Sequence, residues 1–273
     1  MKKQMCQILR TELPVTILLW VAGGICCPGA APLSANSQTN SVDYEEPKIL
    51  SGDIFAMDAE PKKLIFKFQR SATRSGTTVH VLREYTYPDG SPAARERCVY
   101  EAGQLASYEE EKLQTGEKGS AVIRPDPKKP GQRKIFFEYT TGQGGGAKTS
   151  SASENLGNET LVGDMVSAFI AAHWDALAKG SAARFRYIVP SRKETVGFKL
   201  VKESETTWQG KPVVRLRMEP TSFIIAQLVD PIFFVVEKND PHRVLEYIGR
   251  TTPLMKSGNK WKDVDAVTIF DWK

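Results

Sequence analysis

The chain has 273 residues, of which 41% are hydrophobic and 25% are charged, and its formal net charge is +5. This hydrophobic content is sufficient for a core in a chain of this length. The first 35 residues hold three basic residues and one acidic residue, so the remainder carries +3. Such a mild charge gives no indication of nucleic-acid binding.

The N-terminal segment has the order of features typical of a secretory signal peptide. Lys2, Lys3 and Arg10 form a basic start, an apolar run follows from Leu13 to Ala22, and small and turn-forming residues continue to Ala35. We therefore expect a signal peptide over residues 1–35 and an extracytoplasmic, periplasmic mature protein. The apolar stretch is shorter than the roughly 20 residues of a membrane-spanning helix, so no transmembrane anchor is expected.

The positions of the cysteines bear on lipidation and on disulfide formation. Cys26 and Cys27 raise the alternative of a lipoprotein, but neither has Leu three positions earlier and a small residue directly before it, so lipidation is disfavoured. Cys98 is the one cysteine left after cleavage, and the mature chain then forms no intramolecular disulfide. Its strand-like surroundings predict a buried thiol.

Beyond the signal peptide, short apolar runs alternate with turns. Residues 36–46 are polar and predict a flexible leader. Residues 47–273 predict a single β-rich domain in two halves, 47–139 and 160–273, joined by a Gly/Ser-rich loop at 140–158.

A weak repeat indicates the topology of the first half. The turn signals 87–90, 100–103 and 113–116 each end in Gly and recur every 13 residues. Gly supplies the positive φ that tight hairpin turns need, so the repeat predicts a β-meander with one strand and one turn per period.

The second half begins with the strongest helical pattern of the chain. Leu161, Met165, Phe169 and Leu177 recur at helical spacing and predict one long amphipathic helix that ends before Gly180. Residues 222–229 predict a short helical lid that stops before a proline. The fold class is therefore mainly β (α+β): a curved antiparallel sheet or open barrel with one long helix and a short lid.

Three strands of the second half alternate apolar and basic side chains, as expected of an antiparallel sheet with one solvated face. If they pair as a meander, the basic residues form an anion-facing stripe. The alternative is an ordinary solvated face whose cations are paired with Glu194, Glu203 and Glu219. The stripe consists of Arg184, Arg186, Lys199, Arg215 and Arg217.

Motifs for chemistry are absent. The segment 142–149 approaches a phosphate-binding loop, but Ala147 stands where that loop needs Gly and no helix follows. His80, His173 and His242 are isolated, and the run Glu109–Glu111 is interpreted as a solvated strand or turn face. We therefore predict no catalytic residue, no metal site and no cofactor.

The helix 161–177, the lid 223–229 and the closing strand 245–250 together resemble bacterial extracytoplasmic carriers of the lipoprotein-localisation type. In that family an unclosed barrel is covered by helices and binds acyl chains. The resemblance implies a non-enzymatic protein whose partner is a lipid or another hydrophobic small molecule. The ligand-binding residues then expected are Phe169, Trp174, Phe223, Ile225 and Leu228. The alternatives are an envelope protein–protein interaction module without a small-molecule ligand and an extracytoplasmic hydrolase.

Overall fold

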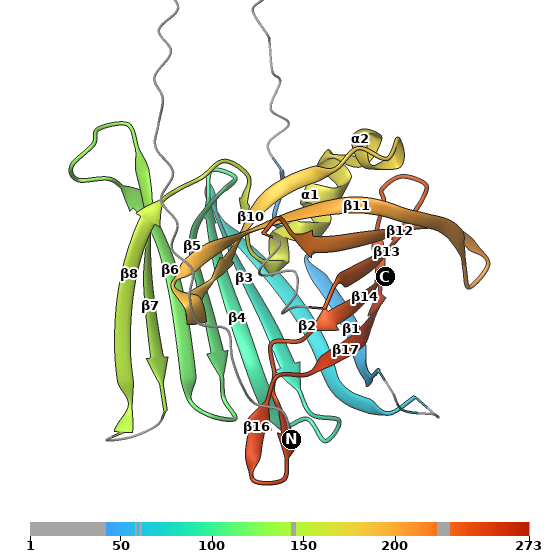
Figure 1. The fold of residues 1–273 in the computed structure, drawn as a ribbon, viewed down its shortest axis with the longest axis horizontal. Helices are drawn as coiled ribbons and strands as arrows, with labels where there is room; N and C mark the ends of the chain where they lie inside the picture. The colour runs from blue at the N-terminus through green and yellow to red at the C-terminus, as the bar shows by residue number, and fades with distance from the viewer. Residues whose placement is uncertain (1–41, 58, 60–61, 143–145, 223–229, 273) are drawn as a thin grey trace, which may run out of the picture. The chain divides into compact units, whose positions relative to one another are not determined.

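The computed structural model describes residues 42–57, 59, 62–142, 146–222 and 230–272. These residues form a mainly β unit (Figure 1). The first half contributes the strands β1 (Ile49–Ala56), β2 (Leu64–Ser75), β3 (Thr78–Thr86), β4 (Pro92–Glu101), β5 (Gln104–Lys112), β6 (Glu117–Pro125), β7 (Arg133–Thr141) and β8 (Lys148–Asn155). The second half contributes β9 (Thr160–Leu161), η2 (Gly163–Met165), α1 (Val166–Ala172), α2 (Trp174–Ala178), β10 (Ala183–Val189), η3 (Pro190–Arg192), β11 (Glu194–Trp208), β12 (Lys211–Pro220), β13 (Ile232–Glu237), β14 (Val244–Arg250), β15 (Met255–Ser257), β16 (Lys260–Lys262) and β17 (Asp265–Asp271).

One 15-stranded sheet runs through both halves, in the order β8-β7-β6-β5-β4-β3-β2-β1-β17-β14-β13-β12-β11-β10-β9. Neighbouring strands are antiparallel except for the short pair β9–β10. The last strand, β17, lies between β1 and β14, so it joins the two halves into one sheet. The expected curved antiparallel sheet is therefore present in the described residues.

The two outermost strands of this sheet, β8 and β9, are neighbours in the chain. Four residues, 156–159, connect them. Because an extended residue spans at most about 3.6 Å, the two edges of the sheet come close together at this end, which requires the sheet to curl. Further along the strands, near the start of β6 and the end of β7, η3 packs against both of them. The concave face of the sheet therefore encloses an interior.

The predicted meander is confirmed in β3–β6. Each strand pairs with the next in antiparallel register. The three turn glycines Gly90, Gly103 and Gly116 have φ of 87°, 75° and 72°. Residues with a Cβ atom disfavour this left-handed conformation, and glycine adopts it readily. Cys98 on β4 is buried, as expected.

The single long helix predicted over residues 161–179 is wrong. Residues 160–161 form β9, whose backbone pairs with β10, so the helical segment cannot begin before Gly163. The backbone at His173, with φ −105° and ψ 12°, then separates α1 from α2. The apolar positions of the pattern are nonetheless buried, and Gly180 ends the segment with φ 85°.

The Gly/Ser-rich stretch expected as a loop at 140–158 contains β8. Every residue of β8 is in register with β7, and nearly all its side chains are exposed. Ser and Thr fit an edge strand of this kind, because the backbone ladder to β7 holds it and both faces meet water. In the segment expected as a flexible leader, Tyr44 stacks on Tyr100 with ring centroids 4.0 Å apart.

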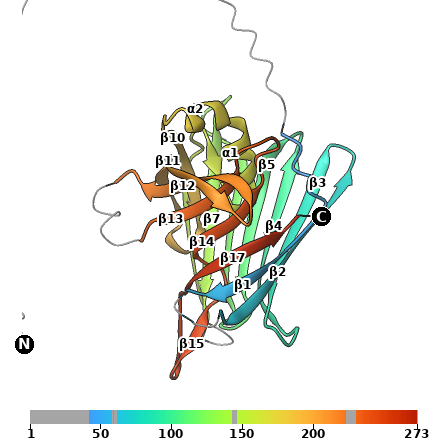
Figure 2. The same ribbon diagram turned by 90° about the vertical axis from the view of Figure 1, so that its right-hand side faces the viewer.

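The α1 segment fills the concave side of the sheet. Figures 1 and 2 show it between the green strands of the first half and the orange strands of the second. Its buried side chains belong to one core cluster that includes residues of β3–β7 and of β10–β14. Within the described residues, no helix combines the length and apolar composition that crossing a membrane requires.

Candidate functional site

A row of charged side chains crosses the concave face of four adjacent strands. In the register of the sheet, Arg70 on β2 lies opposite Arg83 on β3. Arg83 lies opposite Glu96 on β4, and Glu96 lies opposite Glu110 on β5. Directly opposite residues share a face and have Cβ atoms about 5 Å apart. Because the side chains around this row are core residues, its four charges must be balanced locally.

The first ion pair of the row joins Arg70 to Asp164 of η2. Arg70 Nε donates to Asp164 Oδ1 at 2.7 Å, and the two side chains are 6% and 1% exposed. Tyr100 donates its hydroxyl to Asp164 Oδ2 at 2.8 Å. Arg70 also donates to the carbonyl oxygens of Tyr44, at 2.7 Å, and Pro47. This pair is therefore charge-neutral and fully hydrogen-bonded.

The second ion pair joins Arg83 to Glu96. Arg83 Nη1 lies 2.5 Å from Glu96 Oε2, with side chains 15% and 5% exposed. Glu96 Oε1 accepts from the hydroxyl of Thr252 and, at 3.4 Å, from that of Tyr85. The guanidinium lies over the ring of Phe68, 5.1 Å from its centroid. Glu96 is thus held by three donors, two from β3 and one from Thr252, which follows β14.

Glu110 differs from the other three members of the row. Its one hydrogen bond within the described residues comes from the Tyr108 hydroxyl, at a long 3.4 Å. The neighbouring cation, Lys112, lies 3.7 Å from Glu117 and 3.8 Å from Asp263 instead. Burial, and then the negative charge of Glu96, raises the pKa of Glu110 to about 7. This carboxyl is therefore poised between its protonated and ionised forms at neutral pH.

These charges form part of the wall of an interior cavity of about 580 Å³. Gly163 and α1 cover one side of it, and Gly163 has no room for a side chain because a Cβ would lie 2.6 Å from Arg83 Nη1. The remaining wall is largely apolar. Its apolar residues include Leu50, Ile54, Phe68, Val196, Phe198, Met218, Ile232, Phe234, Val244 and Phe270.

Two of the five expected ligand-binding residues, Phe169 and Trp174, belong to the described part of the chain. Phe169 is buried in α1 against Phe185, with ring centroids 5.1 Å apart, and Trp174 stacks on His242 at 4.0 Å. Neither is part of the cavity wall formed by the described residues. Phe223, Ile225 and Leu228 lie outside the described residues, as does the lid that they were expected to form.

The five basic residues of the predicted anion-facing stripe lie on the opposite, convex face of β10–β12. They are Arg184, Arg186, Lys199, Arg215 and Arg217. Most of them have partners there. Lys199 and Arg217 lie 2.9 and 3.0 Å from Glu219, Arg215 lies 2.7 Å from Glu203, and Arg186 donates to the Thr195 carbonyl at 2.8 Å. Arg184 is exposed and opposite Lys199. The carboxylates on the same face reduce the net charge of the stripe.

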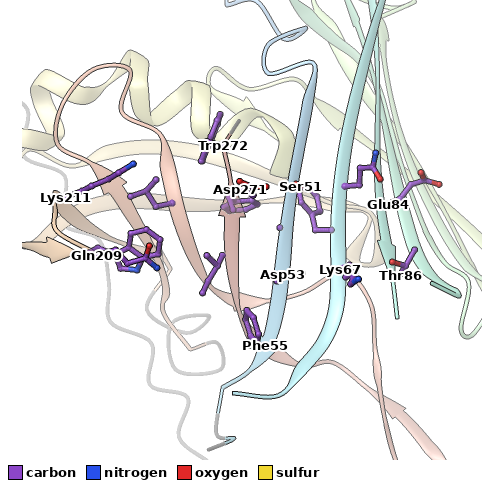
Figure 3. A pocket seen from close by; sticks show the side chains of 17 residues that line it. Ser51, Asp53, Phe55, Lys67, Glu84, Thr86, Gln209, Lys211, Asp271 and Trp272 are labelled. Atoms are coloured by element: carbon purple, nitrogen blue, oxygen red, sulfur yellow. The ribbon is translucent and has the colours of Figure 1, made fainter. Parts of the chain in front are cut away.

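A second hollow, of about 760 Å³, opens on the convex face beside β1 and β2 (Figure 3). Side chains of Asp53, Lys67 and Glu84 lie on one side, and Gln209 and Lys211 lie on the other. All five are exposed, so water already solvates their polar groups. The interior cavity holds buried charges instead, and we take it as the candidate functional site.

The interior row of charges is not among the sites predicted from the sequence. Glu110 was interpreted as part of a solvated face, and the structure turns it inward while Glu111 pairs with Arg95 outside. A signal was available, because Arg70 continues the inward alternation of Phe66 and Phe68, and Glu96 stands between Ala94 and Cys98. A charged residue at an inward strand position indicates a buried polar site.

No family model matches this chain, and no curated protein matches it significantly. Among solved structures, it is similar to a beta-barrel-like protein of the domain of unknown function DUF1849 from Brucella abortus, with 10% identity over 82% of this chain and 96% of that one, at a TM-score of 0.36. Aeromonas veronii immune modulator A matches with 7% identity over 81% of this chain and 93% of that one, at a TM-score of 0.14. The fold and the site define a mainly β protein with a cavity inside a curved sheet.

Proposed function

We propose that this protein binds a lipid or another hydrophobic small molecule in its interior cavity, outside the cytoplasm. The observation that carries the proposal is the cavity itself, because its wall combines many apolar side chains with polar and charged groups, and small-molecule sites use apolar side chains for contact and polar groups for orientation. Its volume of about 580 Å³ also lies within the range of roughly 300–1,000 Å³ of such sites.

The test fills the cavity and leaves the fold intact. Nile red, a neutral dye whose emission rises in apolar surroundings, should bind the wild-type protein saturably. Met218→Trp places a larger ring in the cavity wall and should weaken binding by about tenfold or more, equivalent to about 1.4 kcal/mol. Val201→Trp is the matched control, because Val201 lies on the neighbouring strand and points to the convex face. It should bind as wild type does.

Two outcomes would contradict the proposal. The first is wild-type protein without saturable dye binding, and the second is equal binding by both variants. Either outcome would favour the alternative function, an envelope interaction module that binds a protein partner through the surface of the sheet. Mass spectrometry of organic extracts from protein purified from its own envelope would identify a resident lipid.

The extracytoplasmic location has its own test. The first 35 residues support export, so the mature protein should begin near Asn36. Intact-mass measurement of the secreted protein should agree with this start and show no acyl addition. A diacylglyceryl mass on Cys26 or Cys27 would contradict the free mature form and make the protein a lipoprotein.

An extracytoplasmic hydrolase is the second candidate, favoured by one observation. Glu96 is ion-paired with Arg83, whereas Glu110 has no such partner within the described residues and its pKa is raised to about 7, and two carboxyls in such different environments are typical of the acid–base pair of a hydrolytic site. Activity on an ester or glycoside panel that disappears in Glu110→Gln would favour this function over binding alone.

A further inference from the structure

The row together with Asp164 carries two positive and three negative charges when every carboxyl is ionised. Arg70 is balanced by Asp164, and Arg83 is balanced by Glu96. Glu110 has no cation within ion-pair distance among the described residues. One negative charge in the row therefore remains without a partner.

We infer that Glu110 is the headgroup contact of the cavity and that the preferred ligand is an amphiphile with a protonated amine. This inference rests on the proposed binding function and names the chemical class of its ligand. A long-chain amine would place its chain against the apolar wall and donate its N–H groups to Glu110. The cation would then supply the missing positive charge.

Among the described residues around Glu110, no cation lies within ion-pair distance of its carboxylate. On the same strand, Tyr108 donates one long hydrogen bond. Lys112 is shared between Glu117 of β6 and Asp263 of the segment before β17. On η3, Arg192 pairs with Glu194 at 2.6 Å and is half exposed. On β4, Glu96 adds a second negative charge, and Tyr139 on β7 is an uncharged neighbour across Gly119.

The same geometry selects against an anionic headgroup. A carboxylate or phosphate near Glu110 would face Glu96 as well, and like charges in a buried site repel strongly. A neutral alcohol would form a hydrogen bond and leave the charge balance unchanged. The expected order of affinity is therefore amine above alcohol above carboxylate for chains of equal length.

Amine binding should also release a proton. Without ligand, Glu110 is largely protonated below its pKa of about 7. An alkylammonium with an ordinary pKa near 10 keeps its own proton, so it binds to the ionised form of Glu110. The affinity for the amine should therefore rise with pH below 7 and level off above it, while the affinity for an alcohol should not.

The experiment uses decylamine and decanol as competitors of Nile red, at pH 5 and pH 8. Wild-type protein should prefer the amine by about tenfold or more at pH 8 and lose most of this preference at pH 5. Glu110→Gln should remove the preference at pH 8, so that the amine and the alcohol bind with similar affinities. Glu111→Gln is the control, because Glu111 lies next in sequence and pairs with Arg95 on the convex face. It should retain the wild-type preference.

The outcomes separate this inference from the function on which it rests. If Nile red and decanol bind but the amine has no advantage at pH 8, the role of Glu110 is overturned and the cavity remains a binding site. The same holds if Glu110→Gln keeps the preference. If neither dye nor alcohol binds the wild-type protein, both the binding function and this inference fail.

Discussion

Arg70 and Asp164 form a buried ion pair across 94 residues of sequence, with Arg70 Nε 2.7 Å from Asp164 Oδ1. Arg70 belongs to β2 in the first half, and Asp164 belongs to the segment that leads into α1. The pair therefore fixes the helical segment of the second half against the strands of the first. The same segment covers the interior cavity.

Arg70→Met should destabilise the protein strongly. The substitution keeps most of the side-chain volume but leaves Asp164 as an uncompensated buried charge, which typically costs about 3–5 kcal/mol. Urea denaturation at pH 7 would measure the loss. The double variant Arg70→Met with Asp164→Leu should recover a large part of it, because it removes both charges.

The control for this prediction is on the same strand. Arg74 also forms two ion pairs, with Asp43 and Glu45, but they lie at the surface. Arg74→Met should have a much smaller effect on the free energy of unfolding, because water solvates the remaining carboxylates. Equal losses for Arg70→Met and Arg74→Met would contradict the assigned burial.

Glu110 should make the stability of the protein depend on pH. Its pKa is raised from 4.5 to about 7, so the folded protein holds this proton more tightly than the unfolded chain does. The resulting contribution to stability is fully present below about pH 4.5 and is lost as the pH rises to about 7. The total loss is about 3 kcal/mol.

Comparison with Glu110→Gln isolates this effect, since the other titrating groups are common to both proteins. The free energy of unfolding of the variant, relative to wild type, should increase between pH 4.5 and 7 and stay constant above. Denaturation curves at several pH values would measure it. A difference that does not change with pH would show that Glu110 titrates as an ordinary exposed carboxyl.

The strands were predictable because their signal is local. Phe66 and Phe68 alternate with Lys67 and Gln69, and β2 follows directly from that period. The break at His173 was not predictable, because the helical period continues through it and the backbone there responds to packing. The strand β8 has no apolar alternation, since it is held by its backbone ladder to β7.

The candidate site was only partly visible in the sequence. The inward position of Arg70 can be deduced from alternation within its own strand. That Glu96 and Glu110 are opposite one another depends on the register between β4 and β5, which a bulge near Tyr100 shifts. The partner of Arg70 is set by tertiary structure alone. A single sequence therefore indicates inward charges but not how they are paired.

Phe169→Ala should test the packing of α1. Phe169 is 5% exposed and contacts Phe185 and His173. Removal of a buried Phe side chain typically costs about 3–5 kcal/mol. Denaturation would measure the loss, with Asp175→Ala on the exposed face of α2 as the control. A loss below about 0.5 kcal/mol, the usual size at surface sites, would show that α1 does not pack on the sheet.

Gly119→Ala should test the closure of the curved sheet at η3. A Cβ at Gly119 would lie 2.6 Å from Pro190 Cβ and 3.1 Å from Tyr139 Cδ2. Real Cβ atoms do not approach other atoms so closely, so η3 or β6 must shift, and overpacking of this kind typically costs about 1–3 kcal/mol. Gly146→Ala is the control, because a Cβ there has no neighbour within 4 Å. Hydrogen exchange should report faster exchange in η3 and the start of β11 for Gly119→Ala, since the contact that holds this corner against β6 is displaced. Equal stability of the two variants would mean that the edges of the sheet are not held together at this position.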